Sequence, residues 1–180
     1  MRVPSDRPIA VFTQGLSGSG KSYWSRRVLE GSVDVESLLW IDTDQWLESH
    51  PEYDPRNPSE LYEWAAAQAH AAHRNALQER QSFFLDGTLS DPRNVRNIAA
   101  AKAAGYFTLL ITVDVSLKLA LGQNARRARH VPEDVIRAKA RTMPTAILRG
   151  IEVADAGWII TRQDVTDPGT VEAWVSQEEN

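Results

Sequence analysis

The sequence predicts a three-layer α/β/α fold, with helices on both faces of a central, mostly parallel sheet. Three observations predict it: short apolar runs alternate with helical patterns, a glycine-rich loop follows the first run, and polar or acidic residues follow the next three. Apolar runs bounded by polar segments are typical of strands buried on both faces. The expected strands are residues 9–12, 38–41, 83–85, 107–113 and 158–161.

Helical patterns separate these runs. Residues 57–59 give a start signal to an alanine-rich helix, and Asp91 followed by Pro92 starts another that ends before Gly105. The expected helices are residues 23–30, 60–80, 91–104, 116–127 and 132–148. Residues 48–58, which contain three prolines, are expected to form a surface loop near the site or a passive connector.

Length and composition predict one domain over residues 1–180, with residues 177–180 as a frayed tail. Twenty basic and twenty-four acidic residues give a net charge of −4, which argues against a surface that coats nucleic acid. The absence of cysteine excludes disulfides and thiolate metal sites. The N-terminus lacks the apolar core of a signal peptide, and no run approaches a membrane span of about twenty residues. We therefore expect a soluble cytoplasmic protein without a membrane partner.

The most informative motif follows the first expected strand. It matches the Walker A pattern GxxxxGK[ST] of P-loop NTPases at each fixed position and opens a helical segment. The expected nucleotide-binding residues are Gly15, Ser17, Gly18, Ser19, Gly20, Lys21 and Ser22. Backbone N–H groups of such a loop bind the phosphates of ATP, the lysine reaches the outer phosphates, and the serine hydroxyl binds Mg²⁺.

Acidic residues at strand ends indicate what the phosphate is used for. Asp42 and Asp44 follow the second strand, Asp86 and Thr88 the third, and Asp114 the fourth. Ligands of parallel sheets bind at these carboxyl ends, and phosphoryl transfer to a hydroxyl needs a base and a carboxylate on the magnesium side. We assign Asp44 as the base and Asp86 as the magnesium carboxylate. Asp42 contacts the acceptor or caps the next helix, Thr88 is a further expected acceptor contact, and the alternative for Asp86 is a turn cap.

A basic run offers cations for the transferring phosphate. Arg126 and Arg129 are three residues apart and share one face of an expected helix, whereas Arg127 points elsewhere. The alternative is a solvated basic face. Because the run precedes a Val-Pro pair between two helices, residues 126–143 are expected to form a helical lid over the triphosphate. Trp46, close to the base, is expected to line the acceptor pocket.

Three further segments carry a family resemblance. Ile-Asp-Thr-Asp at 41–44 precedes His-Pro-Glu-Tyr-Asp at 50–54, residues 85–88 read Leu-Asp-Gly-Thr, and residues 143–148 read Met-Pro-Thr-Ala-Ile-Leu. Over residues 9–164 the chain resembles the small P-loop kinases that include zeta toxins and phage polynucleotide kinase. The resemblance implies a P-loop kinase fold, ATP and Mg²⁺ as cofactors, Asp44 as base, and Asp86 in place of a zeta-toxin glutamate.

The expected lid resembles that of polynucleotide kinase, which implies that Arg126 contacts the transferring phosphate. Two positions depart from the families. Zeta toxins carry an arginine where this chain has Ser90, and Arg93 is the nearest substitute as an acceptor contact. Polynucleotide kinase carries an arginine just beyond its base, where this chain has Leu47. The first departure weakens the case for a nucleotide-sugar acceptor, and the second weakens the case for a nucleic-acid acceptor.

Four functions stay open at this stage. The leading hypothesis is a zeta-toxin-like kinase that phosphorylates an alcohol group of a small molecule; the resemblance implies a uridine-diphosphate amino sugar and an antitoxin protein as partner. The alternative is a polynucleotide-kinase-like enzyme acting on a nucleic-acid hydroxyl, terminal or on a modified base. A non-catalytic ATP-binding switch would need no acceptor carboxylate. A slow ATPase would release phosphate whatever acceptor is present.

Overall fold

The structure is a computed structural model, and it describes residues 3–4, 6–54, 59–127, 129–164 and 166–176. The expected tail at 177–180 lies outside the described residues, as do residues 57 and 58 of the helix start signal and the part of the expected loop from 55 to 58. The rest of that loop is shorter than expected, because residues 48 and 49 belong to a helix.

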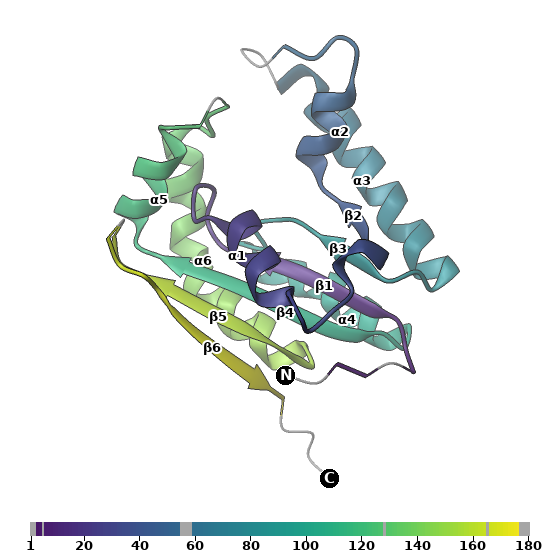
Figure 1. The fold of residues 1–180 in the computed structure, drawn as a ribbon. Coiled ribbons are helices and arrows are strands. Elements are labelled where there is room, and N and C mark those ends of the chain that lie inside the picture. Colours follow the sequence, from purple (N-terminus) through teal and green to yellow (C-terminus); the bar gives the residue numbers. More distant parts are fainter. Residues whose placement is uncertain (1–2, 5, 55–58, 128, 165, 177–180) are drawn as a thin grey trace.

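The described residues form a six-stranded sheet in the order β2-β3-β1-β4-β5-β6 (Figure 1). Its strands are β1 (Ile9–Gln14), β2 (Leu39–Ile41), β3 (Phe83–Leu85), β4 (Phe107–Val115), β5 (Ala156–Arg162) and β6 (Thr170–Val175). Strands β1 to β5 pair in parallel, and β6 pairs antiparallel with β5. All five expected strands are present, so the predicted α/β class with a mostly parallel sheet is confirmed.

Strand β6 was not expected from the sequence. Five of its six residues are exposed, and its only large apolar contact with a core cluster comes from Trp174. An exposed edge strand needs no continuous apolar run, so it lacks the signal that identified the buried strands.

Helices cover both faces of the sheet (Figure 1). They are α1 (Lys21–Leu29), α2 (Thr43–Ser49), α3 (Ser59–Glu79), α4 (Val95–Ala103), α5 (Leu117–Asn124) and α6 (Glu133–Val153), with 3₁₀ turns η1 (Val35–Ser37) and η2 (Pro92–Asn94). Neighbouring residues of β1 face opposite layers: Val11 packs in a core cluster with residues of α1 and α5, and Phe12 packs in another with residues of α3 and α4. This alternation is why the strands are apolar on both sides.

Two helix C-termini differ from the prediction by three or more residues. Helix α5 ends at Asn124 rather than near residue 127, and α6 continues to Val153, five residues beyond the expected end. Two of the expected start signals are confirmed: Asp91 accepts a hydrogen bond from the backbone N–H of Arg93, and Ser116 accepts one from Leu119. None of the described helices combines the length and apolar character needed to cross a membrane.

A buried carboxylate ties three elements of the sheet layer together. Asp155, at the start of β5, accepts hydrogen bonds of 2.8 Å from both the backbone N–H and the hydroxyl of Thr108 in β4. Its other oxygen lies 2.7 Å from Nζ of Lys102 in α4. Burial raises the pKa of Asp155, but the hydrogen bonds from Lys102 and Thr108 lower it more, so the pKa falls below its ordinary value.

Candidate active site

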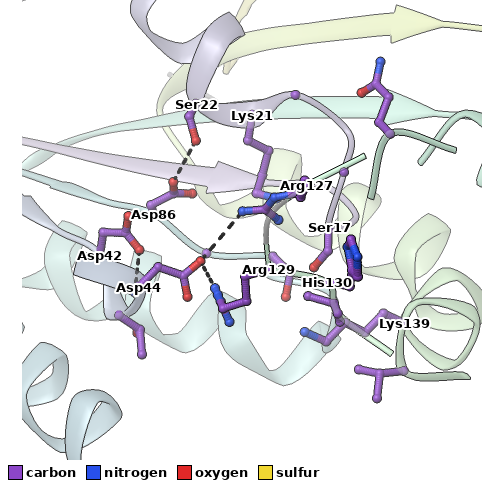
Figure 2. A pocket seen from close by; sticks show the side chains of 18 of the residues that line it. Ser17, Lys21, Ser22, Asp42, Asp44, Asp86, Arg127, Arg129, His130 and Lys139 are labelled. Carbon is purple, nitrogen blue, oxygen red and sulfur yellow. Dashed lines mark hydrogen bonds and ion pairs between the residues drawn. The ribbon is translucent and has the colours of Figure 1, made fainter. Parts of the chain in front are cut away.

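A cavity of about 790 Å³ lies beyond the carboxyl ends of β1, β2 and β3. Its lining comes from the loop after β1, the starts of α1 and α3, α2, the residues after β3, the end of α5, the loop between α5 and α6, and the first turns of α6. Figure 2 shows that side chains from these elements point toward one another. The predicted phosphate loop and the predicted acidic residues after β2 and β3 therefore meet at one site, whereas Asp114, expected after the fourth strand, lies within β4 and does not line the cavity.

The loop after β1 has a backbone that only glycine fits at two positions. Gly15 has φ +145°, and a Cβ there would lie 2.5 Å from the carbonyl oxygen of Val113 in β4. Gly18 has φ +83°, and a Cβ there would lie 2.3 Å from the carbonyl oxygen of Ala120 in α5. The loop is therefore packed tightly against two neighbouring elements. This geometry fits a phosphate cradle at the N-terminus of α1.

Lys21 folds back over this loop. Its Nζ donates hydrogen bonds to the carbonyl oxygens of Gly15, at 3.2 Å, and Leu16, at 3.1 Å. Burial lowers the pKa of Lys21, while the nearby negative charge of Asp86 opposes the shift. A phosphate group bound in the loop would restore an anionic partner to this buried ammonium group.

Ser22 and Asp86 are side by side, as expected for a magnesium site. The Ser22 hydroxyl donates to one carboxylate oxygen of Asp86 at 3.4 Å, and the Thr13 hydroxyl donates to the other at 2.7 Å. Proteins bind Mg²⁺ through one or two such ligands together with substrate phosphates and water, and this donor set fits that pattern. Within the described residues, no group of three or more His, Cys, Asp or Glu side chains forms a metal cage.

Thr13 was missed by the sequence interpretation. It is fully buried in β1, and its hydroxyl also accepts a hydrogen bond of 2.9 Å from the backbone N–H of Gly87. Thr13 therefore fixes the orientation of Asp86 from behind. The available signal was a hydroxyl residue at the end of an otherwise apolar run.

Asp42 and Asp44 both line the cavity but do different things. Asp42 caps α2: its side chain accepts a hydrogen bond of 2.9 Å from the backbone N–H of Asp44. Burial raises the pKa of Asp42 to about 6, helped by the negative charges of Asp86, Asp44 and Glu48, while the cap hydrogen bond opposes the rise. The Asp44 carboxylate is ion-paired with Arg129, and Nη2 of Arg127 lies 4.0 Å from the same oxygen (Figure 2).

The arginines reach the cavity in a different way from the prediction. Because α5 ends at Asn124, Arg126 and Arg129 do not share a helix face, and that expectation is wrong. Arg127 and Arg129 line the cavity, whereas Arg126 is exposed and does not line it. The parts of the expected lid at the cavity are the loop between α5 and α6, which we call the 125–132 loop, and the first turns of α6. Residue 128 of this loop lies outside the described part of the chain.

Asn124 anchors the 125–132 loop. Its buried side-chain amide donates to the carbonyl oxygen of Val131 at 2.8 Å and accepts from the Val131 N–H at 3.1 Å. The ring Nδ1 of His130 lies 3.1 Å from the Asn124 carbonyl oxygen. The sequence offered no signal for this anchor, because an asparagine near a helix end is common.

The further lining residues that were not predicted include one lysine, one glutamate and two tyrosines. Lys139 enters from α6, and burial lowers its pKa. Tyr23, Glu48 and Tyr62 enter from α1, α2 and α3. Whether these side chains reach the cavity depends on which face of each helix is turned toward it. The packing of α2 on α3 and of α6 on the sheet layer determines that face. The pattern of apolar and polar residues in one sequence does not specify that packing.

Among the predicted acceptor contacts, Asp42 and Thr88 line the cavity. Trp46 is 36% exposed and does not line it. Arg93 is exposed and bound to Asp91 through its Nη2 at 2.5 Å, again away from the cavity lining. The structure therefore does not bring Trp46 and Arg93 to the site.

A comparison with models of protein families identifies the family of this chain. The family model described as zeta toxin matches residues 2–166. The chain belongs to the zeta toxin family. No curated protein matches it in sequence.

Solved structures agree with the family in fold. A chain from the PezAT chromosomal toxin-antitoxin system of Streptococcus pneumoniae is similar with a TM-score of 0.72 and 16% identity, covering 96% of this chain and 74% of that one. A chain of the AvrRxo1-ORF1:-ORF2 complex with ATP gives 0.70 and 13%, covering 96% and 61%. A chain of the Pnkp1/Rnl/Hen1 RNA repair complex gives 0.60 and 15%, covering 81% and 47%.

These identities support a shared fold. This zeta-toxin-family chain spans less than two thirds of the AvrRxo1 and Pnkp1 complex chains that it matches. Family and fold together support a P-loop kinase.

Proposed function

We propose that the protein is a phosphotransferase that uses ATP and Mg²⁺ and transfers the γ-phosphate to a hydroxyl group. The observation that carries this proposal is the shared cavity: Lys21 and the Ser22–Asp86 pair face the same space as the Asp44 carboxylate. A nucleotide switch would need only the phosphate loop. A carboxylate across the cavity from that loop is what transfer to an acceptor requires.

Asp44 is the general base in this mechanism. Its carboxylate orients the acceptor hydroxyl and takes the proton while the hydroxyl oxygen bonds to the γ-phosphorus. The bond between that phosphorus and the β–γ bridging oxygen breaks, and ADP leaves with the bonding electrons. Lys21 lies where it can bind the outer phosphates, and Arg127 and Arg129 can move from Asp44 to the transferring group, which frees the carboxylate.

Ser22 and Asp86 are the residues that would hold Mg²⁺. When bound, the ion would neutralise the negative charge that develops on the phosphate oxygens. Thr13 keeps the Asp86 carboxylate turned toward Ser22 through its 2.7 Å hydrogen bond. The protein's part is thus to present one hydroxyl and one oriented carboxylate beside the phosphate loop.

Family resemblance makes a nucleotide sugar the first acceptor to test. The PezAT toxin-antitoxin likeness likewise supports a test for an antitoxin partner, as a proposal for this chain. Asp42 and Thr88 are proposed acceptor contacts because both line the cavity. A polynucleotide acceptor has less support, since Leu47 stands where polynucleotide kinase has an arginine and is fully buried in the core.

The test is transfer of labelled γ-phosphate from ATP, with Mg²⁺, to panels of nucleotide sugars and 5′-hydroxyl oligonucleotides. We expect label on one acceptor class and ADP formation that depends on that acceptor. Lys21→Ala should lower kcat by about 100-fold or more, because its charge acts chiefly in the transition state. Tight ATP binding without transfer to any hydroxyl would favour the switch, and phosphate release independent of acceptor would favour a slow ATPase.

A further inference from the structure

Three consecutive residues at the end of β1 hold the segment that follows β3. Thr13 holds the start of this segment, as described above. The backbone N–H of Gly15 donates a hydrogen bond of 3.0 Å to the carbonyl oxygen of Thr88. Between these two residues, Nε2 of Gln14 donates to the carbonyl oxygen of Leu89, also at 3.0 Å. The strand that leads into the phosphate loop therefore also fixes the residues that follow β3 at the cavity.

The side chain of Gln14 is a buried amide with one fixed orientation. It is 1% exposed and does not line the cavity. Its Oε1 accepts a hydrogen bond of 3.1 Å from the Thr112 hydroxyl in β4, which leaves Nε2 to donate to Leu89. Gly150 of α6 lies so close that a Cβ there would be 3.3 Å from Oε1. Because a buried amide without partners is costly, these contacts hold the Leu89 carbonyl in place.

Leu89 has a backbone conformation that its side chain disfavours. Its φ of +42° lies in the left-handed region, which residues with a Cβ rarely adopt. Such a conformation persists only where the surrounding structure holds it. Here the Leu89 side chain is packed in a core cluster with residues of α3 and α4, and its carbonyl oxygen is bound by Gln14.

The turn at Leu89 decides which side chain of this segment reaches the cavity. Thr88 lines the cavity, whereas Leu89 and Ser90 are buried and do not line it. The Thr88 hydroxyl lies 3.4 Å from the Ser90 hydroxyl, a long contact that leaves it able to bind a ligand. Because a change in φ swings the chain about that residue, relaxation of Leu89 to a negative φ would displace Thr88 relative to Asp44.

We propose that Gln14 is a positioning residue for the phosphate acceptor: through the Leu89 carbonyl, it holds the turn that presents Thr88 to the acceptor. This inference rests on the proposed kinase function, in which Thr88 is an acceptor contact. Both hydrogen bonds of the Gln14 side chain go to residues outside the phosphate loop. Acceptor binding therefore depends on Gln14, and ATP binding does not.

The test uses Gln14→Met, which keeps an unbranched side chain of similar length and removes both hydrogen bonds. The acceptor is UDP-N-acetylglucosamine or a 5′-hydroxyl oligonucleotide, whichever the wild-type protein phosphorylates. Steady-state kinetics at saturating ATP and Mg²⁺ give kcat and the KM of the acceptor. Calorimetry gives the affinity for a non-hydrolysable ATP analogue.

We expect Gln14→Met to raise the acceptor KM at least tenfold, with kcat and the affinity for the ATP analogue changed less than threefold. A contact made equally in the ground state and the transition state affects KM in this way. Thr112→Val removes only the hydrogen bond that orients the amide, so it should raise KM in the same direction by less. This milder variant gives the answer if Gln14→Met does not fold.

A double-mutant cycle tests whether Gln14 acts through Thr88. Thr88→Val removes the hydroxyl at the cavity, and adding Gln14→Met to it should change the acceptor KM less than threefold further. The matched control is Tyr106→Phe, which also removes a buried donor to a backbone carbonyl, at 2.6 Å from that of Ala76, and does not line the cavity. Tyr106→Phe should keep the wild-type acceptor KM.

Four results would overturn the positioning role. They are a wild-type KM in Gln14→Met, an equal loss of affinity for the ATP analogue, a full additional loss in the Thr88→Val background, and the same rise in KM in Tyr106→Phe. If wild type phosphorylates neither acceptor, the crystal structure of Gln14→Met decides. Leu89 at a negative φ with Thr88 displaced would support the positioning role without the kinase function, and an unchanged turn would contradict it.

Discussion

At the scale of single residues, Asp42 and Asp44 show how two carboxylates two positions apart acquire different tasks. One carboxylate oxygen of Asp42 accepts the hydrogen bond that caps α2, so the position of this side chain is fixed by the fold. Asp44 points into the cavity toward the arginines of the 125–132 loop. The sequence could place both at a strand end, and it could name the cap as the alternative role of Asp42. The partner of Asp44 could not be read from it, because Arg129 is distant in the chain.

The raised pKa of Asp42 predicts a pH-dependent cost to folding. A carboxyl whose folded pKa is about 6, against 3.8 ordinarily, favours the folded state most below pH 3.8, and this contribution is lost as pH rises toward 6. Asn keeps the cap but not the charge. We expect the free energy of unfolding of Asp42→Asn, relative to that of wild type, to rise by about 1–2 kcal/mol from pH 4 to pH 8. This value is smaller than the full pKa shift would give, because Asp42 is partly exposed to solvent. Urea unfolding of wild type and Asp42→Asn at pH 4 and pH 8 measures this change.

Asp91 provides the matched control for this experiment. It also caps a helical turn, but a hydrogen bond from the Arg93 side chain lowers its pKa to about 2. The sign is therefore reversed: the charged form favours the folded state above pH 3.8, and that contribution is lost as pH falls toward 2. Asp91→Asn should not gain stability at pH 8. An equal gain in both variants would show that burial of Asp42 is not the cause.

At the scale of elements, the 125–132 loop decides which arginine meets the phosphate. The sequence places a basic run between two helices, and this position is confirmed. The face that the arginines present depends on the residue at which α5 ends. The two hydrogen bonds between the Asn124 side chain and the Val131 backbone hold the following residues in a loop, so α5 ends at Asn124. Helical spacing alone therefore selected Arg126 where the cavity contains Arg127 and Arg129.

The presence of Arg129 in the cavity, and the absence of Arg126 from its lining, predict different effects of alanine substitutions at these two positions. Arg129→Ala should lower kcat for phosphate transfer by about 100-fold, because its guanidinium lies within the cavity and can meet the developing charge. Family resemblance assigns that role to Arg126 instead, although its side chain is exposed. Steady-state kinetics of Arg126→Ala, Arg127→Ala and Arg129→Ala decide between them. Wild-type turnover in Arg129→Ala with loss in Arg126→Ala would contradict the assignment drawn from the structure.

Elements also show why the parallel strands were predictable and β6 was not. A strand covered by helices on both faces must be apolar along its length, and this leaves a signal in the chain. Strand β6 lies at the edge of the sheet, antiparallel to β5, with most residues exposed. Its position follows from backbone pairing with β5 rather than from its own composition.

At the scale of the whole molecule, Asp155 joins α4, β4 and β5 at the amino ends of these two strands. Removal of its carboxylate leaves the Thr108 N–H and hydroxyl without their partner in the core. We expect Asp155→Ala to lower the free energy of unfolding by about 2–4 kcal/mol, from lost hydrogen bonds and an unpaired lysine. Lys102→Ala, which removes only the partly exposed partner, should cost less. Chemical denaturation of both variants makes the comparison.

The lowered pKa of Asp155 gives that prediction a pH signature. The charged carboxylate stabilises the folded protein above its ordinary pKa of 3.8, and the contribution is lost as pH falls through the lower folded value. The stability difference between wild type and Asp155→Ala should therefore shrink in acid. A difference that stays constant from pH 7 to pH 2 would assign the effect to packing instead of charge.

The whole fold brings a phosphate loop and an acceptor carboxylate together from opposite sides of one cavity, and the central claim is that Asp44 uses this arrangement for phosphate transfer. The most direct measurement is a single-turnover assay with excess enzyme and labelled ATP, comparing wild type with Asp44→Asn on the acceptor that wild type phosphorylates. We predict at least a 100-fold slower transfer step with ATP affinity changed less than threefold. Transfer at the wild-type rate in Asp44→Asn would contradict the account.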